Sequence, residues 1–253
     1  GFETTDRRDF FDLAIGNVPF GNYKVDDRAY NKLGFSIHNY FFAKALDQVR
    51  PGGVVAFVTS RYTMDQQSPE VRKYLAERAE LLGAIRLPNN AFRANAGTDV
   101  VADIIFLQKR ERPMTIEPDW VHLGENADGF AINQYFIDHP EMVLGEQTSE
   151  STQYGPGYTV SPTAGATLAD ELRDAVQRIH GTYVPAALPE LAEGEEIRES
   201  IPADPSVKNY SYTVVDQLWI DNVTRNGLGS FEGDPYSVLT TENGVIISED
   251  IFN

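Results

Sequence analysis

The chain has 253 residues, of which 42% are hydrophobic and 11% aromatic, and this content excludes a disordered or fibrous protein. The formal charge of −17 argues against general polyanion binding by the chain as a whole. The absence of cysteine excludes disulfides, thiolate metal sites and cysteine nucleophiles, and it favours a reducing cytoplasmic location. No apolar run approaches the ~20 residues that span a bilayer, so we expect no membrane partner.

The charge is distributed unevenly along the chain. Residues 1–112 carry 16 basic and 14 acidic side chains, whereas residues 113–253 carry 5 basic and 24 acidic ones. The two parts therefore have different roles or different neighbours. The chain also begins without methionine and enters a strand pattern within a few residues, so we expect it to be a piece of a longer polypeptide.

The first 112 residues alternate between strand and helix patterns. Apolar runs predict strands at 11–16, 54–59, 81–87 and 100–108, and the first of these reads as buried on both faces. Apolar residues at a spacing of four predict a helix over 36–49, ended by Pro51-Gly52-Gly53, and a second helix is predicted from Ser68 to about Ala79. This order predicts an α/β, doubly wound sheet, in which ligands bind at the carboxyl ends of the strands.

The periodicity weakens after residue 112. The pattern predicts a strand over 120–123, a short helix or extended segment over 132–136, and a helix over 167–180. Residues 181–206 contain four prolines and a glutamate-rich patch and are predicted to be an acidic linker. Short antiparallel strands are predicted at 212–215, 218–220, 237–239 and 245–247. The predicted segments are therefore 1–112, 113–180, 181–206 and 207–253.

One motif stands directly after the first strand. Asn17, Val18, Pro19 and Phe20 follow the run from Asp12 to Ile15. This segment resembles motif IV of the amino-group, adenine-specific DNA methyltransferases, in which Asn-Pro-Pro-Tyr or Asn-Pro-Pro-Phe follows an Asp-hydrophobic strand. The alternative is an ordinary turn in which asparagine and proline end the strand.

The resemblance continues in order and spacing through residues 38–42, 51–60, 85–92 and 100–109. It implies that residues 9–110 are the C-terminal half of a Rossmann-like, S-adenosylmethionine-dependent methyltransferase sheet, followed by a smaller acidic α+β region. Residues 133–136 and 139–145 resemble, more weakly, a part of the very large bacterial methylase–helicase polypeptides of mobile elements. A helix-to-turn connection that packs on the core is the alternative for these residues. By the weaker resemblance, residues 113–180 are a family-specific extension and 207–253 the start of a following domain.

The resemblance implies a role for each residue of the motif. The Asn17 side-chain oxygen and the Val18 carbonyl would accept the two hydrogens of the exocyclic amine of a flipped adenine, and Phe20 would stack on the base. Pro19 belongs to the same catalytic loop. Val18 stands where the family usually has proline, so the loop loses one fixed φ angle.

The cofactor implied by the resemblance is S-adenosylmethionine, but the glycine-rich turn that approaches it is absent before the motif. A circularly permuted enzyme would need such a turn later, and Gly155-Pro156-Gly157 and Gly227-Leu228-Gly229 both read better as loops. We therefore expect the cofactor-binding residues to lie in the parent protein, outside this chain, and the chain alone to be inactive.

Other residues carry less specific patterns. Arg61, Arg86 and Arg93 are candidates for DNA contacts near the strand ends, with solvated surface as the alternative. The four histidines show no metal-ligand spacing, so no metal site is predicted. The glutamates between residues 190 and 199 would mimic DNA charge or hold a partner if they are not simply solvated.

The expected function is that of a fragment of an adenine-specific DNA methyltransferase, in a larger protein that also has helicase domains. Its expected partners are DNA and the rest of the parent polypeptide. Two alternatives stay open at this point. A protein-glutamine methyltransferase faces the same chemistry, because an amide nitrogen also has a delocalised lone pair. A noncatalytic scaffold with a degenerate fold would bind DNA or a partner without activity.

Overall fold

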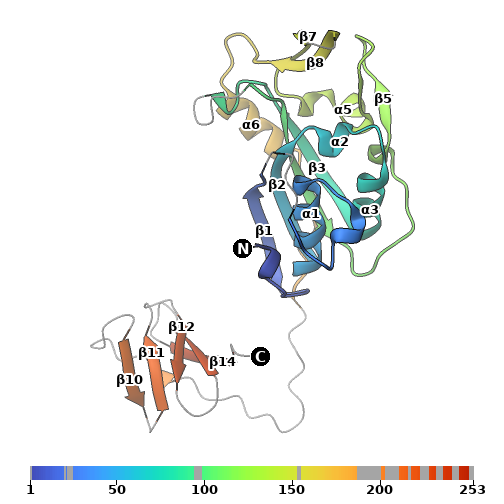
Figure 1. Ribbon diagram of the computed structural model, residues 1–253. Coiled ribbons are helices and arrows are strands. Elements are labelled where there is room, and N and C mark those ends of the chain that lie inside the picture. Colours follow the sequence, from blue (N-terminus) through green and yellow to red (C-terminus); the bar gives the residue numbers. More distant parts are fainter. Residues whose placement is uncertain are drawn as a thin grey trace. The chain divides into compact units, whose positions relative to one another are not determined.

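Figure 1 shows the computed structural model of the protein. The structure describes residues 2–19, 21, 25–93, 99–152 and 155–186, and the backbone of strands at 201–202, 211–215, 218–222, 228–231, 236–240 and 245–250. Phe20 lies outside the described residues. The chain divides into two compact units, Gly1–Ala187 and Leu188–Asn253.

The first unit is built on a four-stranded mixed sheet of order β1-β2-β4-β3, which confirms the predicted α/β class. Its strands are β1 (Phe11–Asn17), β2 (Val49–Ser60), β3 (Ala79–Leu87) and β4 (Ala102–Lys109). β1 is parallel to β2, while β4 lies between β2 and β3 and is antiparallel to both. The four strands predicted in this part of the sequence are all present.

The helix ends before Pro51-Gly52-Gly53, as predicted, but the strand β2 begins earlier than predicted, because it already includes this segment. A Cβ atom on Gly53 would lie 3.0 Å from the Asp12 carbonyl oxygen of the neighbouring strand and 2.8 Å from that of Arg50. Only glycine permits this close approach of two backbones. The preceding Gly52 has φ +79°, a conformation that L side chains rarely adopt.

Helices cover one face of the sheet (Figure 1). They are α1 (Ile37–Gln48) and α3 (Glu70–Arg78), which contact β2 and β3 respectively and also each other. Phe42 of α1 packs edge-on against Phe57 of β2, with ring centroids 5.1 Å apart. Between β2 and α3 lies α2 (Tyr62–Asp65), a single turn that the sequence pattern did not predict. Two 3-10 turns, Phe2–Thr4 and Asn31–Leu33, complete the first part of this unit.

The extension after residue 112 packs into the same core. It contains a 3-10 turn (Asp119–Val121), β5 (Leu123–Glu125), β6 (Ala131–Asn133), α5 (Gln134–Asp138), a 3-10 turn (Pro140–Met142), β7 (Glu146–Thr152), β8 (Gly155–Ser161) and α6 (Leu168–Val176). Val121, Ile132 and Phe136 are wholly buried in one cluster with the sheet. The strand predicted at 120–123 is wrong in its first half, because a 3-10 turn runs to Val121 and β5 begins only at Leu123. Gly155-Pro156-Gly157, predicted to be a loop, begins β8.

The helix α6 confirms most of the predicted helix over 167–180. The Thr167 side chain caps it by accepting a hydrogen bond from the Asp170 backbone N–H. Beyond the helix, Ile179 lies against Gly83 of β3, where a Cβ atom would be 3.1 Å from the Ile179 Cγ1 atom.

The second unit, described only as backbone strands, is antiparallel. Its strands are β9 (Ile201–Pro202), β10 (Ser211–Val215), β11 (Leu218–Asn222), β12 (Leu228–Phe231), β13 (Tyr236–Thr240) and β14 (Val245–Asp250). β10 pairs with β11, and β12, β13, β14 and β9 form a second sheet in that order. The four predicted strands are confirmed, and β12 includes Leu228-Gly229, which was predicted to be a loop.

The prediction that β1 is buried on both faces is wrong. Leu13 is 52% exposed and Ile15 is 76% exposed. They pair with Val54 and Ala56, so they lie on the face of the sheet opposite Phe57 and α1. Within the described residues β1 pairs with β2 alone, and nothing covers this part of the second face. The apolar strand β1 therefore forms an open edge of the described sheet.

This exposure predicts unequal effects of the same substitution at two positions on one face of the sheet. Ile15→Ala changes the free energy of unfolding by less than about 0.5 kcal/mol, because the side chain is already in water. Ile85→Ala, at a wholly buried position of β3, costs about 2–5 kcal/mol. Urea unfolding of the two variants measures both values, and equal losses would mean that β1 is covered in solution.

Candidate functional site

Asn17 stands at the carboxyl end of β1, the edge of the sheet where ligands of doubly wound folds bind. Its backbone is in register with Val58 of β2, and its side chain is exposed. Among the described residues, none forms a hydrogen bond with the Asn17 side-chain amide. The amide oxygen is therefore available to accept a hydrogen bond from a ligand.

Val18 is held in two ways. Its backbone N–H donates a hydrogen bond of 3.0 Å to the Val58 carbonyl, and its side chain is 4% exposed within the core. Proline has no N–H and would lose this bond. The residue that departs from the family pattern is therefore fixed by a hydrogen bond and by burial, where the family's proline is fixed by its ring. Its carbonyl is held at the strand end beside Asn17.

Pro19 is half-buried and continues the motif, whereas Phe20 lies outside the described residues. The stacking role of Phe20 therefore stays a prediction. After Gly21 the next described residue is Val25, and the segment that begins there runs alongside α1. Asp27 anchors this segment by accepting hydrogen bonds from Tyr40 (2.9 Å) and from Lys44 (2.8 Å).

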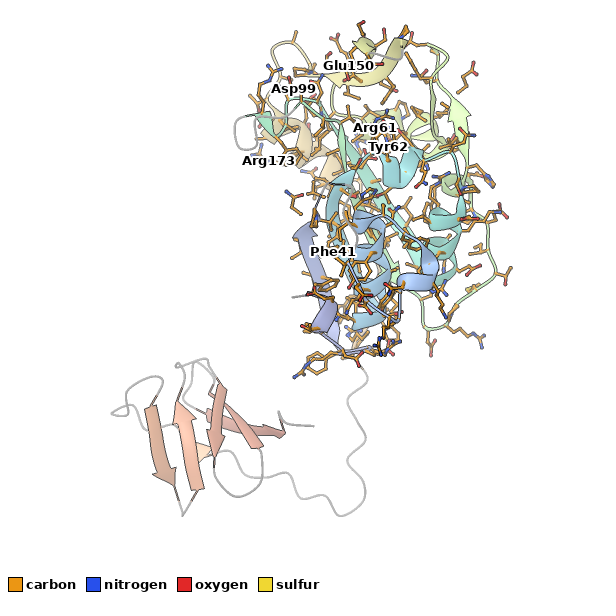
Figure 2. The ribbon with its side chains drawn as sticks, viewed as in Figure 1. Phe41, Arg61, Tyr62, Asp99, Glu150 and Arg173 are labelled. Atoms are coloured by element: carbon orange, nitrogen blue, oxygen red, sulfur yellow. The ribbon has the colours of Figure 1, made fainter. Side chains whose placement is uncertain are left out.

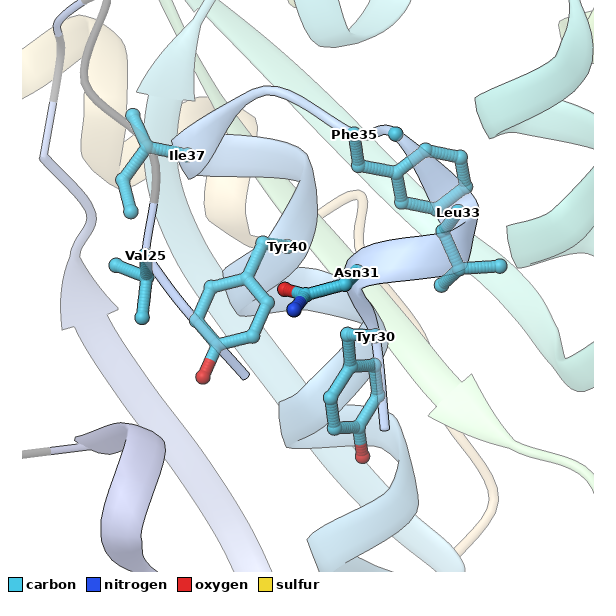
Figure 3. A pocket seen from close by; sticks show the side chains of 8 residues that line it. Val25, Tyr30, Asn31, Leu33, Phe35, Ile37 and Tyr40 are labelled. Carbon is cyan, nitrogen blue, oxygen red and sulfur yellow. The ribbon is translucent and has the colours of Figure 1, made fainter. Parts of the chain in front are cut away.

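Two cavities adjoin this anchored segment. The first is lined by aromatic and apolar side chains with one amide, as Figure 3 shows, and its volume of about 60 Å³ is too small for a nucleobase or a cofactor. Its lining residues include Tyr30, Asn31, Phe35 and Tyr40. The second, of about 280 Å³, reaches Gln48 at the far end of α1. Since α1 leads from the carboxyl to the amino ends of β1 and β2, the second cavity lies away from Asn17.

Buried polar side chains support the sheet beneath the carboxyl ends. Thr59 of β2 and Thr63 of α2 share a hydrogen bond of 3.0 Å, and Thr63 donates one of 3.1 Å to Asn39 of α1. All three are buried. Beside them, burial lowers the pKa of His38, and its Nε2 atom lies 3.0 Å from the Ser36 hydroxyl. Burial therefore favours the neutral form of this imidazole.

Arg86 of β3 forms the centre of a buried ion network. Its guanidinium donates two hydrogen bonds of 2.8 Å to the Asp103 carboxylate on β4. Its Nη1 atom lies 2.9 Å from Asp65 Oδ2, an ion pair without hydrogen-bond geometry. Burial opposes the charge, but the two carboxylates outweigh it and raise the pKa of Arg86 well above its usual range. The structure contradicts the DNA contact predicted for Arg86, because no part of its side chain reaches the surface.

Arg61 follows the end of β2 and shares the same carboxylate. It donates a hydrogen bond of 3.0 Å to Asp65 Oδ2, while the Asn133 backbone N–H donates one of 2.9 Å to Asp65 Oδ1. The Arg61 guanidinium also lies over the ring of Tyr62, 4.4 Å from its centroid. Figure 2 shows Arg61 and Tyr62 next to each other at α2. The extension therefore helps to position the turn that carries these two residues.

Arg93 is the predicted arginine with the most accessible side chain. Its guanidinium makes a two-bond ion pair with Asp99, and both side chains are largely exposed. The pairing lowers the pKa of Asp99. An exposed pair of this kind adds little stability and leaves the arginine accessible to a phosphate. The structure thus places Arg61 directly after the end of β2, buries Arg86, and leaves Arg93 on the surface.

Tyr62 was not identified from the sequence as a candidate site residue. The signal that could have identified it was an aromatic residue next to an arginine, directly after a strand that ends in a threonine and a serine. Within the described part of the chain, no cluster of three metal-ligating side chains is present, and no helix has the length and apolarity needed to cross a bilayer.

No protein-family model matches the chain. Over 118 residues, which are 45% of the chain, it is 35% identical to the protein called defense against restriction protein B of Escherichia phage P1. The matched part is 5% of the length of that relative.

Solved structures show distant likeness. The M protein of the type I restriction enzyme EcoKI is 18% identical, with a TM-score of 0.33 over 41% of this chain and 23% of that one. A type I restriction-modification complex is 16% identical, with a TM-score of 0.36 over 77% of this chain and 40% of that one. A protein from Listeria monocytogenes assigned to the class I S-adenosylmethionine-dependent methyltransferases is 21% identical, with a TM-score of 0.35 over 46% of this chain and 36% of that one.

The two environments of arginine predict unequal effects of one substitution. Arg86→Met leaves the buried Asp103 carboxylate without its cation and Asp65 with Arg61 alone, and it costs about 3–5 kcal/mol of unfolding free energy. Arg93→Met removes an exposed ion pair that water already screens, so its unfolding free energy stays close to that of the wild type. Thermal and urea unfolding of the two variants provide the test. A small loss at Arg86 would show that solvent reaches its network.

Proposed function

We propose that this chain carries the target-amine half of a DNA methyltransferase that methylates the exocyclic amine of adenine. The observation that carries the proposal is the pair of acceptors at the end of β1. Asn17 is exposed and no described residue forms a hydrogen bond with its side-chain amide, while the Val18 carbonyl beside it is held by the hydrogen bond that the Val18 N–H donates to Val58.

The chemistry needs two such acceptors. The lone pair of an aromatic amine is delocalised into the ring, so the nitrogen is a poor nucleophile. Hydrogen bonds from its two hydrogens to Asn17 and Val18 favour a pyramidal nitrogen with a localised lone pair. The adenine would leave the DNA stack to reach this site, and Phe20 and Pro19 would complete the wall against which it packs.

S-adenosylmethionine supplies the methyl group in this class of reaction. The described residues do not fit a site for it, because no glycine-rich turn follows a buried strand at the sheet edge. The open edge of β1 and its exposed Leu13 and Ile15 support an incomplete sheet. We propose that the cofactor is held by another part of a longer cytoplasmic protein, which would also contain helicase domains. The great length of the phage relative is consistent with such a protein.

Two other functions share parts of this geometry. A protein glutamine presents an amide nitrogen with the same delocalised lone pair, so the acceptor pair would serve it as well. The excess of acidic residues after position 112 favours a scaffold that binds a partner. Methyl incorporation measured on DNA and on protein substrates separates adenine methylation from glutamine methylation. DNA binding without methyl transfer would favour the scaffold.

Substituting Asn17 is the direct test of the proposed site. In a protein that joins this chain to the preceding polypeptide, Asn17→Ala lowers methyl transfer to adenine by about 10²-fold or more, the usual effect of removing one preorganised hydrogen-bonding group. Because Asn17 is exposed at a strand end, the circular dichroism spectrum and the melting temperature stay unchanged.

Asn31→Ala is the matched control, because this exposed asparagine lies on the segment along α1 and away from the strand ends. It should retain methyl transfer within about twofold, the range expected of a change distant from the reacting amine. Wild-type activity in the Asn17 variant would contradict the proposed role.

A further inference from the structure

Aromatic rings and guanidinium groups alternate from the surface to the core at the carboxyl end of β2. The Arg61 guanidinium lies 4.4 Å from the centroid of the Tyr62 ring and 5.5 Å from that of Tyr158. The Arg86 guanidinium in turn lies 5.4 Å from the Tyr158 centroid and 4.1 Å from that of Phe136. The inner members are buried, whereas Tyr62 is 54% exposed. Tyr62 is therefore the outer end of a column of cation–π contacts.

The outer end of this column is held firmly. Arg61 is only 18% exposed and is tied to Asp65, which is also paired with Arg86 and bonded by the Asn133 backbone. A second guanidinium nitrogen of Arg61 donates a hydrogen bond of 3.2 Å to the Tyr62 hydroxyl. The ring of Tyr62 thus has a fixed orientation although more than half of it is in water. A planar ligand that stacks on it would lose little of its binding energy to ordering the side chain.

The column and the motif lie at the same edge of the sheet. The Val18 N–H is bonded to the Val58 carbonyl near the end of β2, and Arg61 and Tyr62 follow directly after this strand ends at Ser60. A DNA strand that places its target base at Asn17 would therefore pass along the edge where Tyr62 is exposed.

We propose that Tyr62 stacks on a nucleobase of the DNA strand that contains the target adenine, and that Arg61, Asp65 and Arg86 are positioning residues that hold its ring. This inference rests on the proposed function and adds a second contact with its substrate. Asp65 already neutralises the charge of Arg61, so the column favours an aromatic face over a phosphate. Stacking also tolerates any sequence, because every base has a π-face.

The test measures DNA binding without cofactor or methyl transfer. The 253-residue chain is titrated at low salt into a single-stranded oligonucleotide that contains 2-aminopurine, whose fluorescence is quenched by stacking. Tyr62→Ala weakens binding by about 5- to 100-fold, the loss expected for one stacked base, and reduces the quenching. Tyr62→Phe retains both. Tyr183→Ala, at a tyrosine that is 81% exposed near the amino end of β2, changes neither.

Arg61→Met tests the positioning role. It lowers the quenching but leaves the salt dependence of the affinity unchanged, because no phosphate contact is lost. A salt slope reduced by about one would identify Arg61 as a phosphate contact and overturn its positioning role. Unchanged affinity in Tyr62→Ala, or no binding by the wild-type chain, would overturn the proposal. If Asn17 is still required for methyl transfer in that case, the proposed function stands and only the stacking role fails.

Discussion

The candidate site depends on one buried cation. Arg86 lies inside the protein, where an unpaired charge is very costly, and it is stabilised there by Asp103 and Asp65. These three residues come from β3, β4 and α2, so the ion network joins the far edge of the sheet to the turn after β2. Phe136 and Tyr158 cover it from the extension. The extension is therefore part of the structure that shapes the carboxyl end of the sheet.

A second constraint acts on the motif itself. The parallel pairing of β1 with β2 continues beyond Asn17, because the Val18 N–H bonds to the Val58 carbonyl. This bond fixes the loop at the point where the family that it resembles has proline. The same pairing leaves the outer edge of β1 open and its apolar face in water. One strand thus presents the proposed catalytic asparagine and also forms an open edge of the described sheet.

The sequence predicted which segments form strands and helices better than it predicted how buried they are. Runs of β-branched and aromatic residues predicted β1 to β4, and the spacing of four predicted α1, because both patterns are local. The exposure of β1 was not predictable, since the same apolar run is buried when a neighbouring strand is present. The early start of β2 was not predicted, because the Pro-Gly-Gly segment joins the strand at a close approach of two backbones, which only the partner strand reveals.

The functional residues divide in the same way. Asn17 and Val18 were predicted from the motif, and the structure places them at a strand end. The burial of Arg86 was missed, although a charged residue inside each of two apolar runs, Ile85-Arg86-Leu87 and Ala102-Asp103-Ile104, was a signal of a buried ion pair. The role proposed for Tyr62 was not predicted, because it depends on Arg61, whose guanidinium also lies over Tyr158 of the distant β7–β8 hairpin.

Isothermal titration of S-adenosylmethionine is the most direct test of the claim that this chain holds only the target-amine half of the enzyme. The cofactor is titrated into the 253-residue chain and into a protein extended upstream by about half a domain, roughly 100 residues. The account predicts binding to the longer protein alone. Tight binding to the 253-residue chain would contradict it, because a cofactor site would then lie within this chain. Binding to neither protein would contradict it as well and favour a noncatalytic scaffold.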